Sequence, residues 1–229
     1  LGRAKHKRWV LLANIIDKSM IRNSVAFMIA KACYNDGTGA QQGWNPSGHC
    51  VELVLNGKHL GNYLLCEQIK IDENRVNIQK EYDQDEPKGI SEVGYLIEFD
   101  DSKDELNNFS TSRRKLPCQL KDEVPVNGEH WNYVKNKVQG IEDNLYNKKF
   151  AEAYKDLDIY SVIDQWFIYE LAMNDEYRHP KSVYYYMDGD KKLKAGPVWD
   201  FDWQTFPYFT GINQLGGRKP NYVGWFGSV

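Results

Sequence analysis

The sequence predicts an α+β protein, and three observations support this fold class. Two apolar runs flank an Asn-Gly pair, which is the strongest short-range signal for a β-hairpin. Apolar residues recur at helical spacing before this hairpin and again in the second half of the chain. Strands are followed by helices and then by a second hairpin, an order that is typical of α+β folds.

The first elements are a short apolar run and a helix. Residues 9–14 form either a buried strand or the beginning of a helix. Asp17 is a suitable N-cap for a helix over residues 19–34. The apolar residues of this helix recur at helical spacing and predict its buried stripe: Ile21, Val25, Met28, Ile29 and Ala32.

The hairpin and one further strand come next. Residues 51–55 and 59–67 are the two arms of the hairpin, because the Asn-Gly pair between them tolerates the positive φ angles of a tight turn. Residues 94–100 are predicted to form another strand. A charged loop at residues 79–89 separates this strand from the hairpin.

After Pro125 the pattern becomes helical, with predicted helices at residues 129–144 and 147–155. Asp158 caps a further helix over residues 159–173. Because this helix is apolar around much of its circumference, we expect it at the centre of its lobe. Its apolar residues are Val162, Ile163, Trp166, Phe167, Ile168 and Leu171.

The chain is expected to form a single domain over residues 1–229. A second hairpin pairs residues 182–187 with residues 192–199. The change of character near residues 110–128 predicts a β-rich lobe up to about residue 110 and a helical lobe from about residue 128. The chain begins with leucine and ends abruptly in an aromatic segment, so we expect it to be truncated at both ends.

The composition is that of a globular protein, with 41% hydrophobic and 27% charged residues among 229. The formal net charge of -3 argues against a dedicated nucleic-acid binder. No run approaches the roughly 20 apolar residues that a membrane span requires. The chain is therefore expected to contain no membrane span and to bind no nucleic acid.

The four cysteines are Cys33, Cys50, Cys66 and Cys118, and the absence of Cys-x-x-Cys spacing argues against a zinc knuckle. Cys50 and Cys66 lie at nearly matching distances from the hairpin turn, so a cross-strand disulfide is conceivable. We favour buried free thiols that pack as small hydrophobic groups.

Two carboxylates near the end of the chain, in Trp199-Asp200-Phe201-Asp202, are its most informative feature. Residues i and i+2 of an extended segment point to the same side, so both carboxylates can bind one hard cation. Carboxylates do this when a magnesium ion is held beside phosphates. An ordinary turn with two solvated aspartates is the alternative.

A second acidic segment, Asn174-Asp175-Glu176, lies between the predicted helix 159–173 and the terminal hairpin. In phosphoryl transfer, one carboxylate orients the incoming hydroxyl while others hold the metal at the phosphates. Protein kinases have this order of parts, with a catalytic Asp, a short hairpin and then an Asp-Phe-Gly metal ligand. A structural calcium site and plain helix-cap polarity are the alternatives.

Five segments, in their order along the chain, resemble the CotH kinase family, atypical protein-kinase-like proteins named after a bacterial spore-coat protein. They are residues 9–17, Arg22-Asn23, residues 54–67, residues 174–186 and Trp199-Asp200-Phe201-Asp202. The resemblance implies a two-lobed, atypical kinase-like fold that binds ATP with Mg or Mn. It also implies phosphorylation of serine or threonine in a protein substrate.

The resemblance also implies roles for individual residues. Asp200 corresponds to the metal-binding aspartate, and Asp202 is the neighbouring second carboxylate. The catalytic acid of the family lies in an Asn-x-Asp pattern, so Glu176 aligns with it and Asp175 lies one position early. Either carboxylate is a candidate base. Ser182 stands where the family often has a metal-ligating Asn and is a candidate oxygen ligand.

For each of the other charged residues the sequence allows two roles. Glu67 is a candidate partner for the lysine that contacts ATP phosphates in such proteins, or a solvent-facing acid at the end of a strand. That lysine lies upstream of the first Trp motif in the family, and no lysine of this chain matches it. Arg22 reaches a phosphate or forms a surface ion pair. Arg113-Arg114-Lys115 steers an acidic substrate or ATP, or is simply a charged loop.

Two functions follow as hypotheses. The first is a CotH-type kinase that uses ATP and a divalent metal to phosphorylate a protein. The second is a catalytically inert surface module that uses an aromatic cleft for adhesion or for binding glycans or proteins, and the departures at Glu176 and Ser182 favour it. For either function, we expect an extracytoplasmic or cell-surface location.

Overall fold

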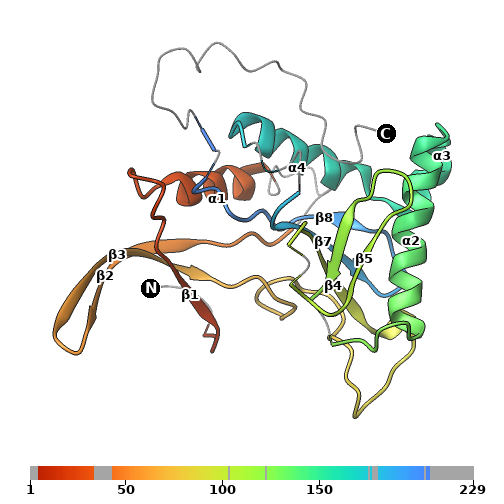
Figure 1. Cartoon of the computed structure of the whole chain (residues 1–229), viewed down its shortest axis with the longest axis horizontal. Coiled ribbons are helices and arrows are strands. Elements are labelled where there is room, and N and C mark those ends of the chain that lie inside the picture. The colour runs from red at the N-terminus through yellow and green to blue at the C-terminus, as the bar shows by residue number, and fades with distance from the viewer. Residues whose placement is uncertain are drawn as a thin grey trace.

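The computed structural model describes residues 5–33, 43–102, 104–121, 123–174, 176, 180–203 and 205–206. These residues form two antiparallel sheets and the helices that flank them (Figure 1), which confirms the α+β class. The three-stranded sheet has the order β1–β3–β2, with strands β1 (Trp9–Leu12), β2 (Gly48–Leu55) and β3 (Lys58–Glu67). The five-stranded sheet has the order β5–β6–β4–β7–β8, with strands β4 (Gly94–Phe99), β5 (Asn108–Ser110), β6 (Pro117–Leu120), β7 (Val183–Asp188) and β8 (Lys194–Ala195). The α-helices are α1 (Arg22–Cys33), α2 (Glu129–Tyr146), α3 (Phe150–Asp156) and α4 (Ile159–Leu171), and a 3-10 helix covers Ile90–Glu92.

The first hairpin is confirmed. Asn56 and Gly57 join β2 to β3 with φ angles of 51° and 77°, both in the left-handed region. Such a turn matches the right-handed twist of the strands that it connects. On its other edge β3 pairs with β1, so residues 9–12 form a strand and not the beginning of a helix.

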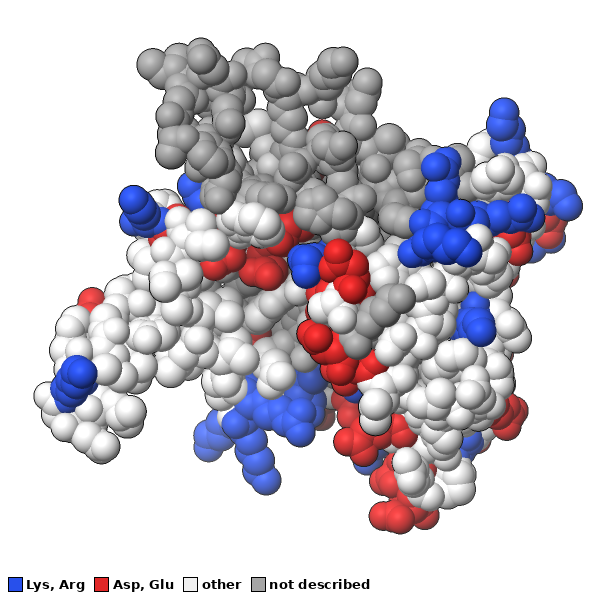
Figure 2. Space-filling view, in the orientation of Figure 1, with Lys and Arg blue, Asp and Glu red and all other residues white. Residues whose placement is uncertain are grey.

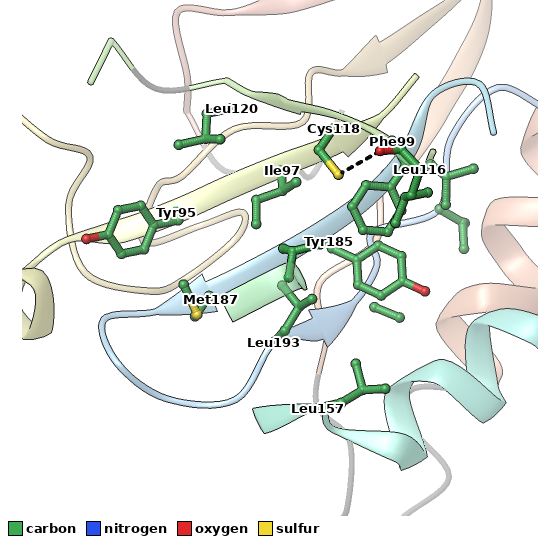
Figure 3. Close-up of a cluster of buried hydrophobic side chains, with 14 of the residues drawn as sticks. Tyr95, Ile97, Phe99, Leu116, Cys118, Leu120, Leu157, Tyr185, Met187 and Leu193 are labelled. Carbon is green, nitrogen blue, oxygen red and sulfur yellow. Dashed lines mark hydrogen bonds between the residues drawn. The ribbon is translucent and has the colours of Figure 1, made fainter. Parts of the chain in front are cut away.

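The five-stranded sheet is the centre of the larger core. Its middle strand β4 is buried along its whole length and lies between β6 and β7. Figure 3 shows their side chains packed together, and Phe99 stacks on Tyr185 with ring centroids 4.6 Å apart. Helix α2 packs against this sheet, because the ring of Trp131 meets that of Phe109 edge-on at 5.8 Å. The sheet joins strands from both sides of the expected lobe boundary, and the division into two lobes stays a prediction.

The prediction of the buried face of α1 is wrong. Its buried residues are Asn23, Ala26, Phe27 and Ala30, whereas Ile21 and Met28 are 52% and 71% exposed. Two alanines allow the helix to approach α4 closely, and Phe27 stacks on Trp199 at 5.9 Å. The buried face of α1 therefore consists of two small alanines, one aromatic ring and Asn23, and it is not the face with the most large apolar residues.

The expectation that α4 is central is also wrong. Ile163, Phe167 and Leu171 are about half exposed, and the buried face includes Ser161 and Gln165. These polar residues bind the sheet. The hydroxyl of Ser161 accepts from the amide of Ala195 at 2.9 Å, and Gln165 Nε2 donates to the carbonyl of Tyr184 at 3.1 Å. Backbone groups of the neighbouring sheet thus select a polar face, since buried amides and carbonyls need partners.

None of the four cysteines, all of which lie in the described part of the chain, forms a disulfide. In the hairpin, Cys50 lies opposite Leu64 and Cys66 lies opposite Gly48, so these two cysteines are not cross-strand neighbours. Cys66 and Cys118 are buried as expected, whereas Cys50 is exposed. None of the helices in the described part of the chain has the length and hydrophobicity needed to cross a membrane.

Candidate functional site

The segment that carries Asp200 and Asp202 follows β8 and is held by α1. Asp200 has a φ of +63°, a left-handed conformation that residues other than glycine rarely adopt. The amide of Phe201 donates to Asn23 Oδ1 at 2.7 Å, and Arg22 Nη1 donates to the carbonyl of Asp202 at 3.2 Å. These two bonds fix the peptides that follow Asp200, so the surrounding structure maintains its strained backbone.

The residues just before Asp200 are fixed as well. The amide of Val198 donates to Oδ1 of the buried Asn45 at 3.0 Å. The carbonyl of Trp199 accepts from the Tyr169 hydroxyl at 3.4 Å, while its ring stacks on Phe27. The positions of the two carboxylates are therefore set by α1, by α4 and by the loop that precedes β2.

Glu176 lies in the same site as Asp200 and Asp202. It is 4% exposed, and its amide donates to Asn174 Oδ1 at 2.9 Å. Burial, followed by the charges of Asp200 and Asp202, raises the pKa of Glu176 to about 8. Burial and Asp202 raise the pKa of Asp200 to about 7, with a contribution from a hydrogen bond between these two carboxyl groups. The structure thus brings together three of the carboxylates that the sequence indicated.

Two further acids, Glu98 and Asp100, extend this negative region. The charge of Asp100 raises the pKa of Glu176 and of Asp200, and Glu98 also raises that of Asp200. Lys121 Nζ lies 2.9 Å from Glu98 Oε2. Figure 2 shows acidic side chains gathered along the middle of this face. Sequence analysis missed both acids, although they repeat the carboxylate–Phe–carboxylate spacing of the first pair at the end of a strand.

Ser182 contacts the acidic region through its backbone amide. Its amide donates to Asp100 Oδ2 at 3.0 Å, and its φ of +50° is another left-handed conformation. Its neighbour Lys181 forms an ion pair with Asp101 at 3.0 Å and acts to lower the pKa of Glu176. Asp175, the second candidate base, lies outside the described residues.

The donor chemistry of the site fits a hard divalent cation, which prefers oxygen ligands. Burial is the main cause of the raised pKa values of Glu176 and Asp200, and the charges of the neighbouring carboxylates add to it. Among the described residues, no group of three or more His, Cys, Asp or Glu side chains is arranged to hold a metal ion. The carboxyl groups of Asp200 and Asp202 are joined by a hydrogen bond, and their oxygens are of the ligand type that a hard cation prefers.

A family model described as CotH kinase protein matches residues 1–222. The chain belongs to the CotH kinase family. The resemblance that the five sequence segments indicated is thereby confirmed. Membership supports a kinase-like function, with the ATP and divalent metal that kinases use in general. A search of curated proteins found no match.

In this CotH domain, Glu67 is buried and does not face solvent. It accepts from the amide and the hydroxyl of Ser47 at 3.1 and 2.8 Å. Its charge also opposes the lowering of the pKa of Arg75 that burial causes. The Arg75 guanidinium lies over the rings of Trp9 and Trp44, 5.4 and 5.7 Å from their centroids. Sequence analysis missed Arg75, because no local motif distinguishes it from a surface arginine.

A cavity of about 1140 Å³ adjoins the acidic region of the CotH domain. Its wall includes Leu96 of β4 and the segment that follows β3. The lining is charged with both signs: four residues are cationic (Arg8, Lys70, Lys80 and Lys121) and six are acidic (Asp72, Glu73, Glu81, Asp83, Asp85 and Glu123). Because Lys121 also binds Glu98, this lysine links the cavity to the carboxylates.

Proposed function

We propose that this CotH domain is a protein kinase that transfers the γ-phosphoryl group of ATP to a serine or threonine hydroxyl of a protein, with Mg²⁺ or Mn²⁺. The observation that carries the proposal is the burial of Glu176 beside Asp200 and Asp202 with raised pKa values. Perturbed carboxylates at a family-specific motif are typical of catalytic groups.

Each carboxylate has a proposed role. Asp200 and Asp202 hold the metal, and the Ser182 hydroxyl is a further oxygen ligand. A bound metal supplies neutralisation of the phosphate charge. Glu176 accepts the proton of the acceptor hydroxyl while the acceptor oxygen bonds to the γ-phosphorus and the bond to the ADP oxygen breaks. Asp175 is the alternative base.

We propose that the nucleotide occupies the cavity whose wall contains Lys121. Lys121 supports this, because it lies on the cavity wall, pairs with Glu98 beside the carboxylates and supplies a positive partner for a phosphate. Arg22, for which the sequence allowed a phosphate contact or a surface ion pair, pairs with the buried Asp17 at 3.5 Å and donates to the Asp202 carbonyl. Its proposed role is to position Asp202. The proposed role of Glu67 in nucleotide binding is indirect: its charge stabilises the charged form of the buried Arg75.

The test is metal-dependent nucleotide binding and self-labelling with γ-labelled ATP and Mn²⁺. Asp200→Ala should abolish both signals. Glu176→Gln should retain binding and lose labelling by about 100-fold or more, as expected for loss of a general base. Asp190→Ala, which removes an exposed carboxylate in the β7–β8 turn, is the matched control and should behave like the wild type. Labelling that survives Asp200→Ala would rule out the assigned metal ligand.

An inert binding module on the same scaffold is the second candidate. It is favoured by the lack, within the described part of the chain, of a group of three or more ligands that could hold a metal. On this reading, neither Mn²⁺ nor ATP stabilises the protein against thermal unfolding, and Glu176→Gln changes no activity. Either function is compatible with an extracytoplasmic or cell-surface location, which immunolabelling of intact cells would test.

A further inference from the structure

Five cations gather on two neighbouring turns, far along the chain from the acidic site. Arg113, Arg114 and Lys115 occupy the β5–β6 turn, and Lys148 and Lys149 occupy the turn between α2 and α3. All five are exposed, and Figure 2 shows Lys and Arg side chains gathered where α2 ends and α3 begins. We call these five residues the basic surface.

A fully buried carboxylate holds the first of these turns. Glu142 of α2 has no exposed area, and it accepts from the Thr111 hydroxyl at 2.5 Å. It also accepts from the amides of Arg113 and Arg114 at 2.9 and 3.0 Å. Burying a carboxylate is unfavourable unless it is fully hydrogen-bonded, and here its bonds fix a turn that presents three consecutive cations.

The two turns form one unit. The Nε atom of Arg113 donates to Asp143 Oδ1 at 2.9 Å, and its guanidinium lies 4.9 Å from the ring centroid of Tyr146. Tyr146 is the last residue of α2, directly before the turn with Lys148 and Lys149. The cations on both turns are thus held in a fixed relation, which reduces the entropy lost when a partner binds.

Lysine is an unfavourable residue for two positions of this surface. Lys115 and Lys148 have φ angles of 59° and 58°, in the left-handed region where glycine or asparagine is strongly preferred. Lys148 follows the C-cap Asn147, a position that glycine fills in most helices that end in this way. Local backbone conformation therefore does not require lysine at either position, and both can be replaced by asparagine without strain.

We propose that the basic surface binds an acidic segment of a partner protein. Within residues 111–116 and 142–150 it carries five cations against one partly exposed carboxylate, Asp143, which pairs with Arg113. The planar guanidinium of arginine matches a carboxylate with two parallel hydrogen bonds. Tyr146 and Phe150, 49% and 47% exposed, add apolar contacts for the side chains of a peptide.

A protein partner fits better than a nucleic acid. The net charge of the chain is -3, so a long polyanion would meet acidic surface beyond these two turns. A short acidic segment matches the limited extent of the basic surface. This proposal is independent of phosphoryl transfer, because none of its residues belongs to the carboxylate site.

The test is binding of a short fluorescein-labelled peptide of alternating aspartate and glutamate, measured by anisotropy at low ionic strength. The variant combines Lys115→Asn with Lys148→Asn, because asparagine suits the left-handed backbone and removes both charges. Its affinity should fall at least about fivefold without a lower melting temperature, and the difference should vanish in high salt. Lys192→Asn, an exposed lysine of the β7–β8 turn, is the charge-matched control and should bind like the wild type.

Several results would overturn the proposal. These are unchanged affinity in the double variant, no binding of the peptide, or equal binding of a peptide of asparagine and glutamine. Tighter binding to polyuridylate RNA or to phosphatidylserine vesicles, lost in the same variant, would assign the surface to a different partner class. Self-association that the variant abolishes would replace the acidic partner with a second copy of this chain.

Discussion

Replacing Asn23 with alanine tests whether this side chain positions Asp200 for metal binding in addition to stabilising the fold. The Asn23 side chain is 1% exposed, and it links the Phe201 amide to Asn14 Oδ1 by bonds of 2.7 and 3.0 Å. Asn23→Ala leaves two buried groups without this partner, at about 1–3 kcal/mol each. The expected loss is therefore about 2–6 kcal/mol, a large part of the roughly 5–15 kcal/mol of a typical domain.

The effect on metal binding follows from the backbone of Asp200. A left-handed conformation costs a residue other than glycine about 1–2 kcal/mol, and the Phe201–Asn23 bond helps to maintain it. If Asp200 relaxes when that bond is lost, the binding-competent population falls by the corresponding factor of about 5–30. The apparent Mn²⁺ dissociation constant should rise by the same factor.

Asn14→Ala is the matched control for this experiment. It removes the Asn14–Asn23 bond but leaves the Phe201–Asn23 bond in place. We expect it to lower the free energy of unfolding in urea by about 1–3 kcal/mol and to leave Mn²⁺ affinity unchanged in calorimetric titration. Equal Mn²⁺ affinity in both variants would refute the argument that Asn23 positions Asp200.

Three further predictions concern pH, a buried carboxylate and a glycine. The folded-state pKa values of Glu176 and Asp200, about 8 and about 7, exceed their unfolded values, so the folded protein favours the protonated carboxyl groups. The stability that these two groups contribute is fully present below about pH 4 and is lost as the pH rises to about 8. Urea unfolding between pH 5 and 8 should show this slope, and Glu176→Gln should reduce it; an unchanged slope would contradict the assignment. Glu142→Ala leaves the Thr111 hydroxyl and two amides of the β5–β6 turn without their acceptor and should lower the free energy of unfolding by at least about 1–3 kcal/mol, the cost of one buried unsatisfied donor, measured by thermal denaturation. Gly94→Ala places a Cβ 2.2 Å from the carbonyl oxygen of Gln79 and should cost about 1–3 kcal/mol in urea unfolding, whereas a neutral result would show that this loop yields easily.

Local signals predicted the hairpin and the acidic pair well. The Asn-Gly turn is specified by two residues that tolerate positive φ, so neighbouring sequence suffices. Asp200 and Glu176 were expected to meet because Glu176 lies in the loop after a helix and a hairpin then leads to Asp200, in the order that kinases use. Their burial and raised pKa values agree with that expectation.

Helix faces were predicted poorly because distant backbone groups select them. Gln165 faces inward to bind the carbonyl of Tyr184, which lies 19 residues further along the chain. Asn23 faces inward to bind the amide of Phe201, 178 residues away. Counting apolar residues within one helix contains no information on such partners, so the apolar sides of α1 and α4 were wrongly placed in the core.

Several unfavourable features concentrate around the segment of Asp200 and Asp202, and they support the proposed site over a turn with two solvated aspartates. Asp200 has a strained φ, and Asn45, which binds the segment, has a buried Nδ2 atom without a hydrogen-bond partner. Glu176 is a carboxyl group buried beside two other carboxylates, and burial followed by their charges raises its pKa to about 8. A turn with two solvated aspartates would need neither the hydrogen bond from Val198 to the buried Asn45 nor the left-handed backbone of Asp200. Natural sequences keep such unfavourable features together where binding or catalysis requires them, because a bound ligand can then recover the stability that they remove.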